Sequence, residues 1–370
     1  QKAVAISKPF RENMKLLSDY WGSFKKRQEL DSVFGLDQVF PLLFNTLFLA
    51  VPVISSTFAS VETMLRNCRG EGSLGTIIVD EAGQAAPHMV VGALYRAQQA
   101  IIVGDPKQIE PVQPVQDLFV KYVGNHDIDQ YRHKSLSVQR LADALNFYAG
   151  TIREQDGSIS WIGCPLVVHR RCGDIMFNIS NDLSYGGFMI NETISKTNSC
   201  LPSCWITYDA TNIMPLDKKN HYVKKQGEIA FILIKHLLAN QVEFEDIFVI
   251  TPFKTVAEGF HSYVKHQLYE LEEVRRKSWL DNNIGTVHTF QGKEARVVIY
   301  MLGCVSNGVD DGAIRWVNTN NVNVAFTRAK ERIYVIGDDK KWRTLNDNFN
   351  FVLSNNRLPL NTEFYKQINL

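Results

Sequence analysis

Two patterns of hydrophobic positions alternate along this chain. Short continuous apolar runs, rich in β-branched residues, are typical of parallel strands that are buried on both faces. Longer segments, in which apolar residues recur at helical spacing, are typical of amphipathic helices. The runs that predict strands are 51–55, 76–79, 100–103, 165–168, 205–208, 247–250, 284–287, 297–302 and 333–336.

Helical spacing fills most of the intervals between these runs. Residues 1–50 follow it throughout, and Leu17, Tyr20, Trp21 and Phe24 form a predicted packing stripe with Lys and Arg between them. Further helices are predicted over 56–65, 87–96, 138–148, 228–239, 256–275 and 322–330. Strands that alternate with helices in two blocks predict an α/β fold with two doubly wound parallel sheets.

The domain boundaries follow from the same alternation. A length of 370 residues is enough for two domains of ordinary size, each with its own core. The polar stretch 150–160 contains Gly150 and Gly157 and is the predicted linker. We therefore expect a helical segment over 1–50 that is part of, or inserted in, a first domain over 51–155, and a second domain over 156–370.

Composition limits the classes of partner. A formal net charge of +1 means that any nucleic-acid surface must be a local basic patch. The most apolar stretch, 42–54, is interrupted by Asn45 and Pro52 and is too short to span a bilayer. No secretory signal is visible, so we expect no membrane partner and an intracellular, cytoplasmic location. The chain opens with Gln1 rather than Met, and we expect it to be a piece of something longer.

The six cysteines show no disulfide framework. The spacing Cys200-x3-Cys204 permits a zinc site as an alternative to plain reduced thiols. The further ligands of such a site would be Cys164, His169 or Cys172. No second closely spaced cysteine pair supports this alternative.

The chemistry of the first half lies at the ends of two predicted strands. The run 76–79 delivers two adjacent carboxylates, Asp80 and Glu81. In open α/β sheets, ligands bind beyond the carboxyl ends of the strands. One carboxylate can hold Mg²⁺ through its waters while the other takes a proton from the water that attacks a nucleoside triphosphate. The run 100–103 ends in a Gly-Asp-Pro turn followed by Gln108, which can sense a terminal phosphate.

The second half carries groups that suit phosphate binding. Gly292 lies in a polar turn after a predicted strand and would let the backbone approach a phosphate closely. Arg328 lies on a predicted helix beside small residues. Its alternatives are a solvated face and a charge donor that neutralises a transferred phosphoryl group, an effect worth about 10³–10⁵ in rate. His169-Arg170-Arg171 follows another strand, where guanidiniums are well placed for phosphate.

Taken in order, these motifs resemble motifs II through VI of superfamily 1 helicases, closest to the Upf-like branch of nonsense-decay and senataxin helicases. The resemblance covers roughly residues 50 to 340. It rests on Asp80-Glu81-Ala82-Gly83-Gln84, Gly104-Asp105-Pro106-Lys107-Gln108, His169-Arg170, Thr251-Pro252-Phe253, Phe290-Gln291-Gly292-Lys293-Glu294 and Asn323-Val324-Ala325-Phe326-Thr327-Arg328. It implies two RecA-like domains, the first incomplete at its N-terminus, that bind ATP and Mg²⁺ in the cleft between them.

The resemblance also implies roles for individual residues. Asp80 would hold the Mg²⁺ through water and Glu81 would activate the hydrolytic water. Gln108 would contact the γ-phosphate, and Arg170 and Arg328 would act as arginine fingers. The residues implied in nucleotide binding are His169, Glu228, Gln291, Gly292 and Glu294. Those implied in binding single-stranded or duplex nucleic acid are Thr57, Pro111, Thr251, Pro252 and His288, for which turn and cap chemistry is the alternative.

One departure from the family bears on activity. The phosphate loop Gly-x4-Gly-Lys-Ser/Thr is absent from these residues. The resemblance therefore implies a fragment of an ATP-dependent helicase or translocase that does not hydrolyse NTP by itself. The main alternative is a catalytically inactive nucleic-acid-binding module of the same fold. A nuclease is a further alternative, but no separate carboxylate-rich metal motif is evident.

Overall fold

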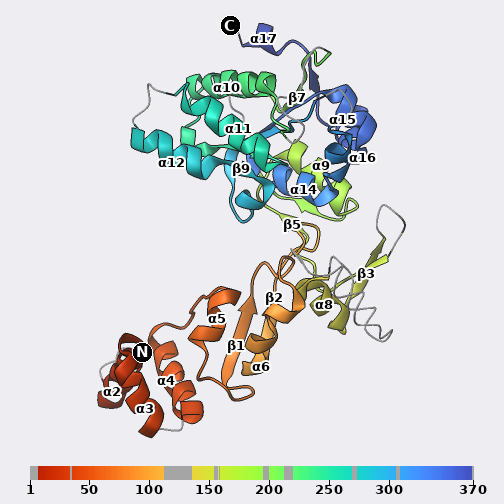
Figure 1. The fold of residues 1–370 in the computed structure, drawn as a ribbon. Helices are drawn as coiled ribbons and strands as arrows, with labels where there is room; N and C mark the ends of the chain where they lie inside the picture. Colours follow the sequence, from red (N-terminus) through yellow and green to blue (C-terminus); the bar gives the residue numbers. More distant parts are fainter. Residues whose placement is uncertain are drawn as a thin grey trace. The chain divides into compact units, whose positions relative to one another are not determined.

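The computed structural model describes residues 7–33, 36–111, 136–153, 157, 159–194, 200–211, 220–268, 273–305 and 309–368. Its contacts divide the chain into two compact units (Figure 1). The first comprises Gln1–Pro106 and Glu110–Phe147, and the second comprises Lys107–Ile109 and Tyr148–Leu370. The predicted domain boundaries stay a prediction.

The N-terminal part of the first unit is helical, as predicted. Its helices are α2 (Lys8–Gly22), α3 (Phe24–Val33) and α4 (Leu36–Ala50). Leu17 and Tyr20 of the predicted stripe are buried, and the ring centroids of Tyr20 and Phe40 lie 4.8 Å apart. Trp21 is 45% exposed. The stripe is therefore a packing surface along Leu17 and Tyr20, with Trp21 at its margin.

A two-stranded parallel sheet forms the other part of the first unit. Strand β1 (Leu74–Val79) pairs with β2 (Ala97–Ile102), with Val79 opposite Ile102. Helices of this unit also include α5 (Phe58–Met64), η1 (Pro87–Met89), α6 (Val91–Arg96) and α8 (Val138–Leu145). The predicted strand over 51–55 is wrong: the segment is irregular, and Val53 is 74% exposed. Pro52 lacks the N–H that a ladder requires.

The second unit contains a six-stranded sheet in the order β12-β7-β11-β10-β8-β9, with all pairs parallel. Its strands are β7 (Cys204–Ile206), β8 (Ile247–Thr251), β9 (Ile284–Thr286), β10 (Ala295–Met301), β11 (Ala329–Ile336) and β12 (Leu360–Asn361). Along β10, Val298 and Tyr300 belong to one hydrophobic cluster, whereas Val297 and Ile299 belong to another. The sheet is therefore buried on both faces, which explains its continuous apolar runs.

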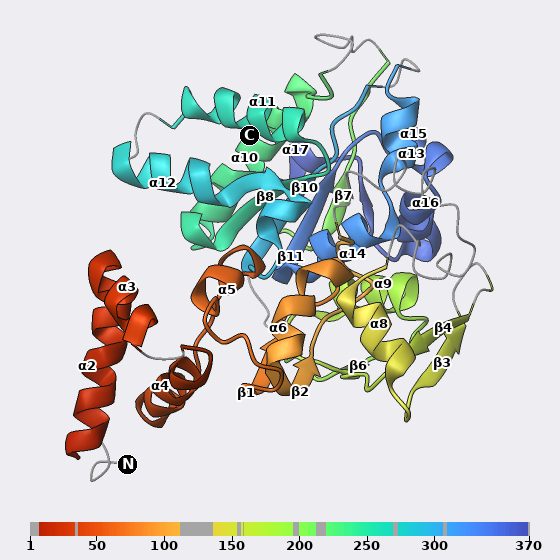
Figure 2. The ribbon, with the colours of Figure 1, turned by 60° about the horizontal axis from the view of Figure 1, so that its bottom comes forward.

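Helices cover both faces of this sheet (Figure 2). One face packs against α9 (Asp174–Ser184), α13 (Asp311–Trp316), α14 (Thr319–Thr327), α15 (Asp339–Leu345) and α16 (Asp347–Leu353). The other packs against α10 (Lys224–Ala239), α11 (Lys254–Lys265), α12 (Glu273–Asn283) and α17 (Phe364–Gln367). This arrangement confirms the predicted doubly wound α/β fold. Short 3₁₀ turns are η3 (Phe244–Asp246), η4 (Val287–Phe290) and η5 (Ser354–Asn356).

Several connections differ from the prediction. Part of the predicted linker forms a hairpin, in which β3 (Gly150–Arg153) pairs antiparallel with β4 (Ile159–Ile162). The predicted strand 165–168 is reduced to β5 (Val168–His169), which pairs with β6 (Ile190–Asn191). The single helix predicted over 256–275 is replaced by α11 and α12. No helix among the described residues is long and apolar enough to cross a membrane.

Candidate functional site

The paired carboxylates lie where β1 ends. Asp80 directly follows Val79 and is exposed, and its Oδ1 accepts a hydrogen bond from the Glu81 N–H at 2.9 Å. Glu81 has φ of 53°, a left-handed conformation that costs a residue with a side chain about 1–3 kcal/mol. The Gln84 amide donates to Glu81 Oε2 at 2.9 Å. The Glu81 carboxylate is therefore held in one direction by a strained backbone and a side-chain donor.

The turns after β1 and β2 are packed directly against each other. The Ala82 N–H donates to the Val103 carbonyl at 2.9 Å. A Cβ at Gly83 would lie 2.5 Å from the Asp105 oxygen, and a Cβ at Gly104 would lie 2.5 Å from the Gly83 nitrogen. Only glycine at both positions permits this backbone approach. The structure thus brings the Asp80–Glu81 turn and the Gly-Asp-Pro turn together, as the strand ends predict.

Arg328 lies in the second unit and contacts two of the predicted motifs. The predicted helix over 322–330 ends earlier: Arg328 is the C-cap of α14, and Ala329 begins β11. Arg328 is 1% exposed, so it is not on a solvated face. Its Nη1 donates to the Lys293 carbonyl at 3.1 Å, and its Nη2 donates to Gln108 Oε1 at 3.4 Å. The guanidinium therefore joins residues 108, 293 and 328, which are far apart in sequence.

The segment Lys107–Ile109 is anchored in the second unit. The Asn323 amide donates to the Lys107 carbonyl at 3.0 Å and to the Tyr185 hydroxyl at 2.9 Å. Ile109 is 7% exposed and belongs to the core cluster of this unit. No role was predicted from the sequence for Asn323 or Tyr185. Asn323 stands between two valines in the helix predicted over 322–330, which was an available signal, whereas no sequence pattern marks Tyr185.

The turn 291–294 combines an open backbone with an unpaired donor. Gly292 has φ of 74°, and a Cβ there would meet nothing within 4 Å. The Gln291 Nε2 is buried without a hydrogen-bond partner among the described residues. Buried polar groups in native proteins almost always have a partner, so an orphan donor here requires an explanation. An acceptor oxygen of a bound nucleotide or strand would satisfy it.

Glu294 lies between two cations. Its Oε1 pairs with Lys330 Nζ at 2.5 Å, and its Oε2 pairs with Arg171 Nε at 3.0 Å. The hydrogen bond from Lys330, followed by the charges of Lys330 and Arg171, holds the pKa of Glu294 below its ordinary value. Lys330 was not among the predicted site residues, because its proximity to Glu294 depends on the pairing of β10 with β11. Arg171 was predicted only as a guanidinium well placed for phosphate.

His169 ends β5 and Arg170 follows it, and the two side chains make different contacts. His169 Nε2 accepts a hydrogen bond from the Cys172 N–H at 2.9 Å, so its proton is on Nδ1. Burial, followed by the charge of Arg171, lowers the pKa of His169 below its ordinary value. Arg170 is exposed and donates from Nε and Nη2 to Glu192 Oε2 at 3.1 and 2.7 Å. The neutral imidazole is part of the fold, whereas Arg170 is held by an exposed carboxylate.

The residues predicted to contact nucleic acid differ in exposure. His288 in η4 and Thr57 before α5 are exposed. Pro111 and Pro252 are buried, and the buried Thr251 uses its hydroxyl to donate to the Phe253 carbonyl at 2.8 Å. His288 and Thr57 can therefore offer side chains to a strand, and the backbone is what the buried positions can offer.

Glu228 does not open its helix, contrary to the prediction. Helix α10 begins at Lys224, and Glu228 lies in its second turn, 3.5 Å from Lys225 Nζ. Its role in nucleotide binding stays a prediction.

The predicted zinc alternative lacks geometric support. Within the described ranges, the one group of three potential ligands is His221, Cys304 and Asp310, which does not include Cys200 or Cys204.

Solved structures of viral helicases resemble this chain only loosely. An arterivirus nonstructural protein 10 helicase in complex with DNA has a TM-score of 0.33 at 13% identity, covering 73% of this chain and 41% of that one. The structure of the PRRSV helicase has a TM-score of 0.33 at 14% identity, covering 72% and 36%.

The curated relatives are all much longer than this chain. The 5'-3' DNA helicase ZGRF1 of Mus musculus is 24% identical over 73% of this chain and 13% of its own length. The ATP-dependent helicase upf1 of Schizosaccharomyces pombe is 25% identical over 72% and 27%. The probable helicase senataxin of Mus musculus is 25% identical over 88% and 12%. The chain thus spans about an eighth to a quarter of these proteins.

Family models cover most of the sequence. Two models, both described as an AAA domain, match residues 11–113 and 129–340. The second alone covers more than half of the 370 residues. The matches span the paired carboxylates, the Gly-Asp-Pro turn and Arg328, which are the groups described above. The chain therefore belongs to the AAA domain family, within the Upf-like branch of superfamily 1 helicases.

Proposed function

We propose that this chain is the motor part of an ATP-dependent nucleic-acid helicase or translocase. The observation that carries the proposal is the direct packing of the two turns after β1 and β2. The Ala82-to-Val103 hydrogen bond holds Asp80, Glu81 and the Gly-Asp-Pro turn together at the carboxyl ends of β1 and β2. Parallel α/β sheets bind their ligands at the carboxyl ends of the strands.

The residues of the first unit fit a magnesium–nucleotide complex. Asp80 presents an exposed carboxylate, the ligand type that Mg²⁺ prefers, and would hold the ion through water. Glu81 would accept the proton of the attacking water, because its carboxylate is already oriented by Gln84. When bound, Mg²⁺ and ATP supply the charge neutralisation and the phosphoryl group of the reaction.

The second unit supplies cationic and amide groups. Arg328 would neutralise charge that develops on the γ-phosphoryl group, and Gln108 would sense that group, since the two side chains are already in contact. The orphan Gln291 amide and the open backbone of Gly292 would accommodate nucleotide oxygens. Glu294 would be kept ionised and in place by Arg171 and Lys330. Arg170 is proposed to act as a second arginine finger, and His169 and Glu228 are proposed to assist in binding nucleotide.

The proposed partner of the motor is a nucleic-acid strand. Exposed His288 and Thr57 would contact it with their side chains, and Pro111, Thr251 and Pro252 would contribute backbone groups. Stacking of a base on a ring is worth about 1–3 kcal/mol. One relative is named as a DNA helicase.

The test is strand binding by the purified chain, measured as fluorescence anisotropy of labelled single-stranded DNA and RNA. We expect His288→Ala to weaken binding by about 5- to 150-fold, the factor that corresponds to one lost stacking contact. The matched control is His266→Ala, because His266 is also exposed and follows α11. Absence of binding by the unmodified chain, or equal effects of the two substitutions, would contradict the proposal.

One observation favours a second candidate, a strand-binding module without turnover. The 370 residues contain no Gly-x4-Gly-Lys-Ser/Thr loop to hold the β- and γ-phosphates. We therefore expect the chain alone to show little or no strand-stimulated ATPase activity, whereas a longer protein that joins this sequence to such a loop should show it. Robust turnover by the chain alone, abolished by Glu81→Gln, would refute this expectation.

A further inference from the structure

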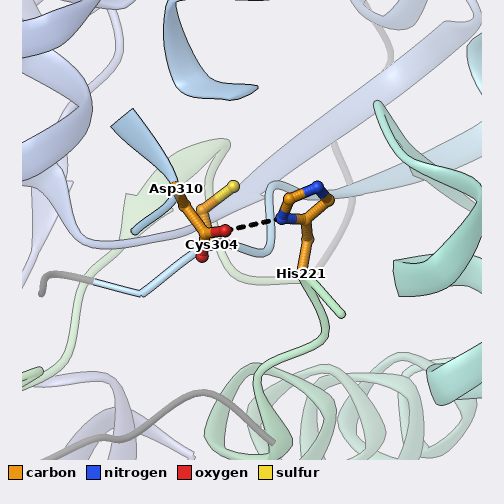
Figure 3. Close-up of side chains that lie close together, drawn as sticks. All are labelled: His221, Cys304 and Asp310. Atoms are coloured by element: carbon orange, nitrogen blue, oxygen red, sulfur yellow. Dashed lines mark hydrogen bonds and ion pairs between the residues drawn. The ribbon is translucent and has the colours of Figure 1, made fainter. Parts of the chain in front are cut away.

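We propose that His221, Cys304 and Asp310 form a binding site for one zinc-type cation, a site that the proposed motor chemistry does not use. The imidazole nitrogen, the thiol sulfur and a carboxylate oxygen lie within 4.8 Å of one another. Figure 3 shows the His221 ring and the Asp310 carboxylate facing each other, with the Cys304 thiol beside them. His221 Nδ1 and Asp310 Oδ1 are 2.7 Å apart.

The three ligands come from different segments that are fixed by the backbone. His221 precedes α10, Cys304 follows β10, and Asp310 is the N-cap of α13. The Cys304 N–H donates to the His221 carbonyl at 2.8 Å. The Val305 N–H donates to Asp310 Oδ2 at 2.8 Å, which orients the carboxylate so that Oδ1 faces the imidazole. Such supporting bonds are typical of metal sites, where outer partners fix the direction of the ligands.

The backbone at the cysteine adopts an unusual conformation. Gly303 and Cys304 have φ of 69° and 63°, both in the left-handed region. A Cβ at Gly303 would lie 2.6 Å from the His221 oxygen. This close approach brings the Cys304 backbone against His221 and directs the thiol toward the pair. For a cysteine, the left-handed conformation costs about 1–3 kcal/mol and persists only where surrounding contacts enforce it.

The donor set selects the class of ion. Sulfur, imidazole nitrogen and one carboxylate oxygen suit zinc and similar transition metals, whereas Mg²⁺ and Ca²⁺ prefer oxygen ligands. Binding would release the thiol proton to solvent and move the imidazole proton from Nδ1 to Nε2, which leaves a thiolate, a carboxylate and a neutral imidazole. The charges of these ligands and a divalent ion sum to zero. A neutral complex avoids the large cost of a net buried charge.

The dimensions require only a small adjustment. Tetrahedral zinc has bonds of about 2.0–2.3 Å to these ligands, so the donor atoms would lie roughly 3.3–3.6 Å apart. The His221–Asp310 pair must therefore open from 2.7 Å, and the thiol must approach. The Asp310 side chain is 3% exposed and the His221 side chain is 23% exposed. His221 thus gives an ion access, and solvent water can complete the coordination.

The site lies beside the segment predicted to contact the strand. The ring centroids of His221 and Phe253 lie 4.7 Å apart, and the backbone N–H of His221 donates to Thr255 Oγ1 at 3.5 Å. A bound ion would therefore tie the 253–255 segment to β10 and α13. The metal proposal does not depend on helicase activity, because its ligands and its test are separate from nucleotide and strand.

The experiment titrates Zn²⁺ and Co²⁺ into the purified metal-free 370-residue chain that carries Cys164→Ser, which removes an exposed thiol. We expect one equivalent of zinc by calorimetry, a thiolate-to-cobalt charge-transfer band, and a higher melting temperature with Zn²⁺. Cys304→Ser should abolish the band, and Asp310→Asn should weaken affinity at least about tenfold, the scale on which even outer partners act.

The matched control is Cys200→Ser, which alters another buried cysteine outside the group. It should retain the band and the affinity. Far-ultraviolet circular dichroism shows whether each variant is folded. If Cys304→Ser does not fold, Asp310→Asn serves as the test. Absence of stoichiometric binding, a band without thiolate character, or equal losses in Cys304→Ser and Cys200→Ser would overturn the proposal.

Discussion

Substitution of Gly83 by alanine should destabilise the turn that carries the paired carboxylates. The added Cβ would lie 2.5 Å from the Asp105 oxygen, where ordinary contacts begin near 3.4 Å. The obstructing atoms are backbone, so they cannot move aside as the end of a flexible side chain can. Relief requires the two turns to separate, which strains or breaks the 2.9 Å bond from Ala82 to Val103.

The magnitude follows from three contributions. Overpacking of a close contact costs about 1–3 kcal/mol. Loss of one hydrogen bond costs about 0.5–1.5 kcal/mol. Alanine restricts the unfolded chain and returns about 0.4–1 kcal/mol. We therefore expect a net local destabilisation of about 0.5–4 kcal/mol, which corresponds to roughly 2- to 1,000-fold faster amide exchange.

Hydrogen exchange followed by mass spectrometry is the suitable assay, because a chain with two units need not unfold in a single transition. The peptide that covers 76–86 should exchange faster in Gly83→Ala and in Gly104→Ala. The control is Gly75→Ala, since Gly75 lies in β1 and a Cβ added there would meet nothing within 4 Å. Both glycines contribute to one contact, so the double substitution should cost less than the sum. Equal exchange in Gly83→Ala and Gly75→Ala would refute the reasoning.

Three further substitutions test the second unit. Arg328→Ala should lower ATP turnover by about 10³-fold or more in a longer protein with a phosphate loop, while strand affinity measured by anisotropy stays nearly unchanged; equal losses would indicate a structural role. Because burial lowers the pKa of His169, the unfolded chain binds the proton more readily, and stability should fall as pH drops below 6.5. Melting curves should show a smaller acid loss in His169→Gln, and an unchanged loss would contradict this. Gln226 is 0% exposed and bonds both backbone groups of Gly303, so Gln226→Leu should cost about 2–4 kcal/mol in urea unfolding, whereas a cost near zero would show that the loop repacks.

The central sheet of the second unit could be predicted because its strands are buried on both faces. All five residues of β8 are buried, so its apolar run has no polar interruption that could obscure it. Edge elements lack this signal. Strand β12 has two residues, and the apolar residues at 51–55 resemble a strand although they lie in an irregular, exposed segment. Burial depends on partners that a local pattern does not contain.

The same limit applies to the site. Asp80 and Asp105 could be expected to lie close together, because each follows a strand and the two strands are neighbours in sequence. The bond from Asn323 to Lys107 spans 216 residues, and the bond from Arg328 to Gln108 spans 220. These contacts depend on how α14 and β11 are placed in the sheet of the second unit. A motif supplies residue types, whereas the fold decides which of them meet.

The distribution of left-handed backbone links the two proposed sites. Among the described residues, five non-glycine residues have positive φ: Glu81, Gln241, Cys304, Asn355 and Asn356. Asparagine tolerates this conformation, and Gln241 lies just beyond the end of α10, where helices commonly adopt it. Glu81 and Cys304 have neither explanation. Each lies just beyond the carboxyl end of a parallel strand, and in each case close backbone contacts around a neighbouring glycine enforce the conformation. Strain that surrounding contacts maintain points to the side chain that it orients, which is a carboxylate in one unit and a thiol in the other.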